Sequence, residues 1–229
     1  MKLLIFLLGA VLTSGVICFG EALADGALRH FLTGRSRCSH CQAELSPWEL
    51  IPIVSFVLLK GRCRHCHSKI EPMYFGFECL GGLLFVLCYQ RFGLSFASGL
   101  NAFRIVLLLA ISFLDFRDMN VPSVLLYAFV ITVLPNFALH KVPFMVVVGG
   151  VVYLFAAKGW MGSGDVWLAS GGMVLVHSWR DVLRFVQVTY ISAALYAVAL
   201  LLVKKRERKD AMAFLPFIAL GIVEVLLHG

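Results

Sequence analysis

Charged residues are scarce in this sequence, and acidic residues are the scarcer kind. Asp, Glu, Lys and Arg make up only 14% of the 229 residues, with 13 acidic against 20 basic side chains. Soluble domains carry about 25% charged residues, so this composition, which is 60% hydrophobic, excludes an ordinary soluble protein. The positive mean hydropathy of +0.89 supports the same exclusion. The sequence therefore predicts an all-α polytopic membrane protein.

Long apolar stretches occupy most of the chain. Because a helix needs about 20 mostly apolar residues to cross a bilayer, we expect about eight transmembrane helices, at residues 2–24, 73–90, 95–114, 121–139, 142–157, 165–179, 182–203 and 212–228. The chain then has three parts. These are a first transmembrane helix at 1–24, a small cytoplasmic insert resembling a zinc ribbon at 25–72, and a transmembrane helical bundle at 73–229.

The first span also has features of a secretory signal. Met1-Lys2, an apolar run and the small residues Ala22-Leu23-Ala24 imitate a signal peptide with its cleavage site. Glu21 within the cleavage region and the dense positive charge after it favour a retained helix instead.

Basic residues predict the topology, because cytoplasmic loops of membrane proteins are rich in Lys and Arg. Two basic segments fall on one side of the eight predicted spans, together with Arg117 and Lys158. They contain Arg29, Arg35, Arg37, Lys60, Arg62, Arg64 and Lys69 in the insert, and Lys204, Lys205, Arg206, Arg208 and Lys209 between the last two spans. That side is expected to be cytoplasmic. The net charge of +7 then reflects topology and anionic membrane lipid, and needs no nucleic-acid partner.

The insert contains two C-x2-C motifs separated by 21 residues. They consist of Cys38 with Cys41, and Cys63 with Cys66. A two-residue gap lets a tight turn present two sulfurs to one metal ion, and two such turns complete a tetrahedron. The spacing predicts structural zinc. The alternatives, two disulfides or free thiols, conflict with a reducing cytosolic location.

Between these motifs the sequence is unexpectedly apolar. Residues 47–59, PWELIPIVSFVLL, are too hydrophobic for a solvated loop and too short to cross a bilayer. We expect this segment to pack against the membrane face or the helix bundle.

Two aspartates, Asp115 and Asp165, lie where apolar stretches meet short polar breaks. An ionised Asp at the bilayer centre costs about 2.5–3.5 kcal/mol, so two such residues suggest a site where they meet. If they share a proton, one acts as a base and the other as an acid toward water. Asp118 is a rival of Asp115, because residues three apart share a helical face.

Glycine and proline flank the two aspartates. Pro122 is expected in the first turn of the next helix. Gly162 and Gly164 would let the backbone turn sharply and bring Asp165 close to a neighbouring helix. Asp165 can also start a helix. Each acid alone is typical of a helix cap, but the pair on one predicted boundary favours a catalytic site.

These motifs together resemble the type IV prepilin peptidase family of Gly-x-Gly-Asp intramembrane aspartyl proteases. The resemblance rests on Asp115 with Pro122, Gly162-Ser163-Gly164-Asp165, the two cysteine motifs, and residues 214–221 (FLPFIALG). It implies that Asp115 and Asp165 are the catalytic pair, at the cytoplasmic face of the bacterial inner membrane. The implied substrates are type IV prepilins or pseudopilins, cleaved after a glycine and then N-methylated from S-adenosylmethionine.

Some residues depart from the family pattern. Trp167 stands where the family commonly has Lys, and Leu215 where it usually has Gly. The end of the first span lacks the family's usual Asn-containing stretch. This departure weakens the resemblance for the methyl-transfer activity more than for proteolysis. Glu78 resembles a glutamate of the family's second span; alternatively, it is a buried acid paired with a polar partner such as Arg104.

Two other classes of protein remain as alternatives. A quinone-linked disulfide oxidoreductase also combines helices with paired cysteines, but the charge bias places these cysteines on the reducing side. A proton-coupled transporter would show repeated halves and acids near the middle of its spans. No internal repeat is evident, and both acids lie at span ends. The main hypothesis therefore remains an aspartyl endopeptidase, whose oligomeric state the sequence leaves open.

Overall fold

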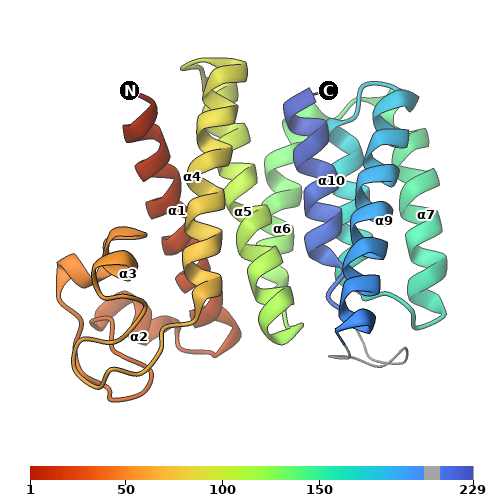
Figure 1. Ribbon diagram of the computed structural model, residues 1–229. Coiled ribbons are helices and arrows are strands. Elements are labelled where there is room, and N and C mark those ends of the chain that lie inside the picture. The colour runs from red at the N-terminus through yellow and green to blue at the C-terminus, as the bar shows by residue number, and fades with distance from the viewer. Residues whose placement is uncertain (204–211, 229) are drawn as a thin grey trace. The chain divides into compact units, whose positions relative to one another are not determined.

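The computed structural model describes residues 1–203 and 212–228 (Figure 1). Within these residues the regular elements are helices, accompanied by two isolated β-bridges. The predicted all-α class is therefore confirmed. The basic cluster at 204–209 lies outside the described residues. The chain divides into two compact units, 1–113 and 114–229, with the division inside one helix.

The first unit is built on two long apolar helices that lie side by side, α1 (Lys2–Ala24) and α4 (Pro72–Phe92) (Figure 1). Glycines allow the two helices to approach closely. A Cβ atom at Gly82 would lie 2.7 Å from the ring of Phe6 and 2.8 Å from its carbonyl oxygen. Such small-residue contacts are the usual means of helix packing in membranes.

The insert contributes three short helical elements to the first unit. They are α2 (Leu28–Thr33), η1 (Pro47–Leu50) and α3 (Val54–Leu58). The Phe56 ring stacks on Phe75 of α4 with centroids 4.9 Å apart. One side of the apolar segment 47–59 thus packs on a helix of the bundle, as expected. Val57 and Leu58 on the other side are exposed.

The helix α5 (Phe96–Asp118) crosses the division between the units and brings Asp115 into the second one. The other helices of the second unit are α6 (Ser123–Val133), η2 (Leu134–Asn136), η3 (Leu139–Lys141), α7 (Val142–Ala157), α8 (Ser163–Gly172), η4 (Met173–Leu175), α9 (Trp179–Leu202) and α10 (Leu215–His228). The short helix α8 contacts α6, α7 and α10. These contacts bury Asp165, Leu168, Ala169, Gly171 and Gly172 of α8.

The predicted number of spans, about eight, is too high. In the described part of the chain, five helices are long and apolar enough to cross a membrane: Lys2–Ala24, Pro72–Phe92, Phe96–Asp118, Leu139–Ala157 and Trp179–Leu202. Residues 123–136 and 215–228 form shorter apolar helices. The predicted span 165–179 is instead divided between α8 and η4 at Gly172. The predicted span 121–139 is broken near Pro135, which lacks the amide that a continuing helix requires.

Candidate functional site

Asp115 lies near the end of α5 and caps another helix. Its side chain is buried, with 7% of the residue exposed. The amide of Leu215 donates a hydrogen bond of 3.1 Å to its Oδ2 atom, and the Phe214 amide also donates to this carboxylate. Helix N-termini leave their first amides without intrahelical partners. Asp115 therefore supplies the acceptor for α10, a helix that begins 100 residues later in the chain.

Asp165 is the third residue of α8 and is buried, with 5% of the residue exposed. Its Oδ2 atom accepts a hydrogen bond of 2.8 Å from the amide of Gly162, the residue that flanks the helix. The carboxylate thus closes the first turn of α8. The partial positive charge of the helix N-terminus favours an anion at this place.

The second unit brings these two carboxyl groups together. The two carboxyl groups lie close enough for their charges to interact. Leu215 connects the two positions, because its amide binds Asp115 while its side chain would lie 3.7 Å from a Cβ atom at Gly164. Two like charges in one buried site oppose joint ionisation, so such a pair tends to hold a single proton. This arrangement can polarise a water molecule from one side and protonate a carbonyl oxygen from the other.

Asp118, the rival of Asp115, has a different environment. Its side chain is 57% exposed and forms an ion pair of 3.3 Å with Arg117. A solvated, ion-paired carboxylate at the end of α5 lacks the burial that distinguishes Asp115.

The flanking residues differ locally from the prediction. Gly162 has the ordinary extended backbone angles φ −79° and ψ 158°, and Gly164 lies inside α8, so the expected sharp glycine turn is absent from this described segment. A Cβ atom at Gly164 would make only ordinary contacts, at 3.4 Å from Leu126 and 3.7 Å from Leu215. Pro122 flanks α6 rather than occupying its first turn. Asp165 lies in the first turn of α8 and does not start that helix.

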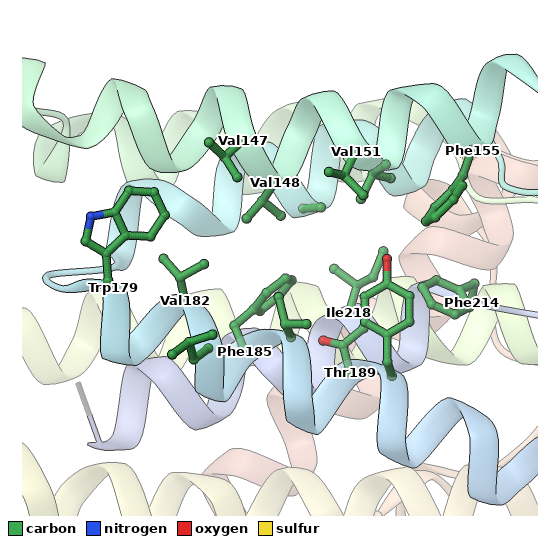
Figure 2. A pocket seen from close by; sticks show the side chains of 15 residues that line it. Val147, Val148, Val151, Phe155, Trp179, Val182, Phe185, Thr189, Phe214 and Ile218 are labelled. Atoms are coloured by element: carbon green, nitrogen blue, oxygen red, sulfur yellow. The ribbon is translucent and has the colours of Figure 1, made fainter.

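Tyr190 on α9 was not singled out from the sequence. The charge of Asp165 acts on this residue, and the Tyr190 ring lies 5.8 Å from the ring of Phe214. Both residues line a cavity of about 490 Å³ in the second unit, shown in Figure 2. Tyr190 shares its predicted span with Arg184, Gln187 and Tyr196, so no local signal distinguished it.

The four cysteines of the insert converge in the first unit. The sulfur atoms of Cys38, Cys41, Cys63 and Cys66 all lie within 4.8 Å of one another. The Cys38 and Cys66 sulfurs are 3.9 Å apart, close to the edge of about 3.8 Å for a tetrahedron with Zn–S bonds of about 2.3 Å. The cysteines are free thiols, and the mutual approach of all four sulfurs favours one shared metal site over two disulfides. The residues present can hold a metal ion such as zinc.

The two cysteine turns have the same backbone structure. The Gln42 amide donates to the Cys38 carbonyl at 2.9 Å, and the His67 amide donates to the Cys63 carbonyl at 3.0 Å. Gln42 and His67 also have similar left-handed φ angles, 58° and 57°. Two matched turns present their sulfurs symmetrically, as a tetrahedral site requires.

Backbone amides prepare one of these sulfurs for metal binding. Hydrogen bonds from the amides of Cys41 and His40 lower the pKa of the Cys38 thiol to about 6. The thiolate is the form that ligates a metal ion. This donor set therefore suits a cation.

Glu78 is buried on α4 and joins three parts of the first unit. Its carboxylate accepts hydrogen bonds of 2.8 Å from the Ser14 hydroxyl of α1 and from the Ile53 amide of the insert. Arg104, the partner suggested from the sequence, donates to Asn101 at 2.7 Å. Glu78 thus has a structural role, whatever further role it has in chemistry.

The fold and this site define a class: a polytopic helical membrane protein with two buried aspartates at helix N-termini and a four-cysteine insert. Comparison with known proteins refines the class. The family model of the bacterial peptidase A24 N-terminal domain matches residues 7–92, and that of the type IV leader peptidase family matches residues 102–198. The chain belongs to the type IV leader peptidase family and is a peptidase.

Two relatives are named prepilin leader peptidase/N-methyltransferase. The protein of Bacillus subtilis (strain 168) is 30% identical over 209 residues, which cover 85% of this chain and 82% of the relative. The protein of Stutzerimonas stutzeri is 28% identical over 223 residues, which cover 89% of this chain and 75% of the relative. No solved structure matches this chain. The oxidoreductase and transporter alternatives gain no support from these matches.

Proposed function

We propose that Asp115 and Asp165 are the catalytic pair of an endopeptidase that removes the leader peptide of type IV prepilins or pseudopilins. The observation that carries this proposal is the convergence of two buried carboxyl groups at the N-termini of α8 and α10. Burial and mutual charge are the conditions under which paired carboxyl groups divide acid and base roles.

In the proposed reaction the ionised aspartate takes a proton from water as the oxygen attacks the scissile carbonyl carbon. The protonated aspartate donates its proton to the carbonyl oxygen, giving a neutral tetrahedral intermediate. As the C–N bond breaks, the aspartate that was the base protonates the leaving amine, and the other aspartate takes a proton from a hydroxyl of the intermediate as the carboxyl product forms. Both aspartates thereby return to their starting protonation states. No covalent bond to the enzyme forms. Because the pair titrates together, either aspartate can start as the base.

The position of the pair at helix ends supports a substrate that lies at the membrane surface. Asp115 lies three residues before the end of α5, and Asp165 lies in the first turn of α8. A site at helix ends can reach an extended peptide at the membrane surface that continues into an apolar helix. Prepilins have this layout, with a short basic leader followed by a hydrophobic stem. The basic insert supports a cytoplasmic site in the bacterial inner membrane by the positive-inside rule.

A structural metal site and a second activity extend the proposal. The four cysteines would hold a structural zinc ion, whose binding supplies folding energy to the small insert. The same protein would methylate the new amino terminus from S-adenosylmethionine. The names of the two relatives support this second extension. The mass of the mature substrate tests it, because methylation adds one methyl group to the amino terminus.

The decisive experiment is co-expression with a prepilin. Asp115→Asn and Asp165→Asn should insert into the membrane normally yet leave the leader attached. Asp118→Asn is the matched control, because it removes an exposed carboxylate from the same helix, and it should still process the substrate. Processing retained by either of the first two variants would remove that residue from the catalytic pair.

A further inference from the structure

A groove runs between α7 and α9 in the second unit, with α10 forming part of its floor (Figure 2). The floor residues Val148 and Phe185 are buried, whereas the rim residues Val151 and Leu183 are exposed. The groove therefore opens sideways between two helices that are long and apolar enough to span a membrane. Its lining is almost entirely apolar.

The groove has two different ends. At one end the Trp179 ring packs against Phe144, with centroids 4.8 Å apart. At the other end are Tyr190 and Phe214. Tyr190 lies eleven positions after Trp179 on α9, which corresponds to about 16 Å of helix.

The Tyr190 end adjoins the two aspartates. The Phe214 amide donates a hydrogen bond to Asp115, and the charge of Asp165 acts on Tyr190. The apolar lining thus extends from Phe214 and Tyr190, which lie beside the carboxyl pair, along α9 toward Trp179.

One polar side chain lies on the floor of the groove. Thr189 is 1% exposed, and its hydroxyl oxygen faces α10, where a Cβ atom at Gly221 would lie 2.3 Å from it. The oxygen is therefore covered by the protein, and the groove offers its ligand apolar contacts.

The structure assigns this groove to the apolar stem of the substrate, an inference that rests on the proposed function. We propose that the side chains following the scissile bond lie between α7 and α9, against the buried floor residues Val148 and Phe185. A helix of about 16 Å length and 10 Å diameter would occupy about 1,250 Å³. The cavity, at about 490 Å³, therefore receives one face of the stem.

Cleavage kinetics with the full-length enzyme in membranes test the groove. Val148→Phe fills the floor and should lower kcat/KM by about tenfold, the equivalent of losing one buried apolar side chain of the substrate. Val146→Phe, at an exposed position of α7 outside the groove, is the control and should leave kcat/KM unchanged.

Photo-crosslinking provides an independent measurement. A benzophenone amino acid at Val151, in an Asp165→Asn background that retains substrate, should crosslink to stem residues just after the scissile bond. The same probe at Tyr153, which is exposed on α7 outside the groove, should not. Crosslinks to lipid alone from Val151, or equal stem crosslinks from both positions, would overturn the inference.

The two proposals fail in different ways. A wild-type protein that does not cleave a prepilin overturns the proposed function and this inference with it. Normal cleavage by the wild type, with unchanged kinetics in Val148→Phe, overturns the groove assignment alone.

Discussion

Asp115 accepts a hydrogen bond of 3.1 Å from the backbone amide of Leu215, at the start of α10. One carboxylate therefore has a structural role as the cap of a distant helix and a proposed chemical role beside Asp165. The two roles need different properties of the side chain. Capping needs an acceptor oxygen, whereas the proposed catalysis needs a group that can gain and lose a proton.

Substitutions of Asp115 should separate these roles. Asp115→Asn keeps a carbonyl oxygen for the Leu215 amide, so its stability should stay close to that of the wild type. Asp115→Ala removes the acceptor and should lower stability by about 0.5–2 kcal/mol, the usual cost of a lost helix cap. Neither variant should cleave the leader. Thermal unfolding of the purified proteins, with leader processing in parallel, measures both effects; a stable Asn variant that still cleaves would contradict the proposed role.

The sequence predicts the helices best where apolar residues are continuous. The predicted bounds of the first span, 2–24, and of the fifth, 142–157, are those of α1 and α7. The four cysteines could also be grouped correctly, because their spacing is itself a geometric signal. Local patterns suffice for such features.

Other features depend on contacts between distant residues and leave no local pattern. Asp115 capping α10 is one example, because a cap supplied by another helix is invisible in the sequence around Leu215. The groove is another, since Val148 and Phe185 are apolar residues in apolar spans until the fold places them on one surface. The break of α8 at Gly172 shows that hydropathy alone does not fix helix length.

Metal removal should destabilise the insert before it affects the proposed chemistry. The double variant Cys38→Ser, Cys63→Ser should lose zinc, because it removes two of four ligands. Structural zinc sites contribute an apparent binding energy of about 10–16 kcal/mol to small domains. We therefore expect proteolytic cleavage within residues 25–72 and a lower yield, with leader processing retained per folded molecule. Metal analysis and limited proteolysis measure these effects.

His40→Ala is the matched control for the zinc prediction, because His40 neighbours a ligand without belonging to the four-cysteine cluster. It should retain about one zinc per chain. If the double variant kept its full yield but lost cleavage, the insert would have a chemical role and the structural interpretation would be wrong.

Gly82 allows α1 and α4 to pack closely. In Gly82→Ala the new methyl group would lie 2.8 Å from the carbonyl oxygen of Phe6, a backbone atom that cannot rotate away. The two helices must then move apart, at a cost of about 1–3 kcal/mol. Gly76→Ala on the same helix has no neighbour within 4 Å and should gain up to about 1 kcal/mol in helix propensity. Melting temperatures should therefore shift in opposite directions, and a common shift would show that α1 and α4 do not pack in this way.

Glu78 holds the insert to α4 through the Ile53 amide. Ile53 is a β-branched residue with φ 65°, a conformation that is costly without support from its surroundings. Glu78→Gln can still accept from Ile53 and can donate its amide to the Ser14 hydroxyl, so the connection should survive. Glu78→Met leaves the Ile53 amide without its acceptor, and the attachment should weaken by about 1–3 kcal/mol.

Hydrogen exchange at the Ile53 amide measures this attachment. In Glu78→Met the Ile53 amide should exchange about tenfold faster or more, since each 1.4 kcal/mol corresponds to a factor of ten. In Glu78→Gln its exchange rate should stay close to that of the wild type. Glu71→Met, an exposed glutamate just before α4, is the control. Because Glu78→Gln preserves the contacts and removes the charge, an activity lost in that variant with unchanged exchange would assign the carboxylate a chemical role. Unchanged exchange in Glu78→Met would instead show that other contacts hold the insert in place.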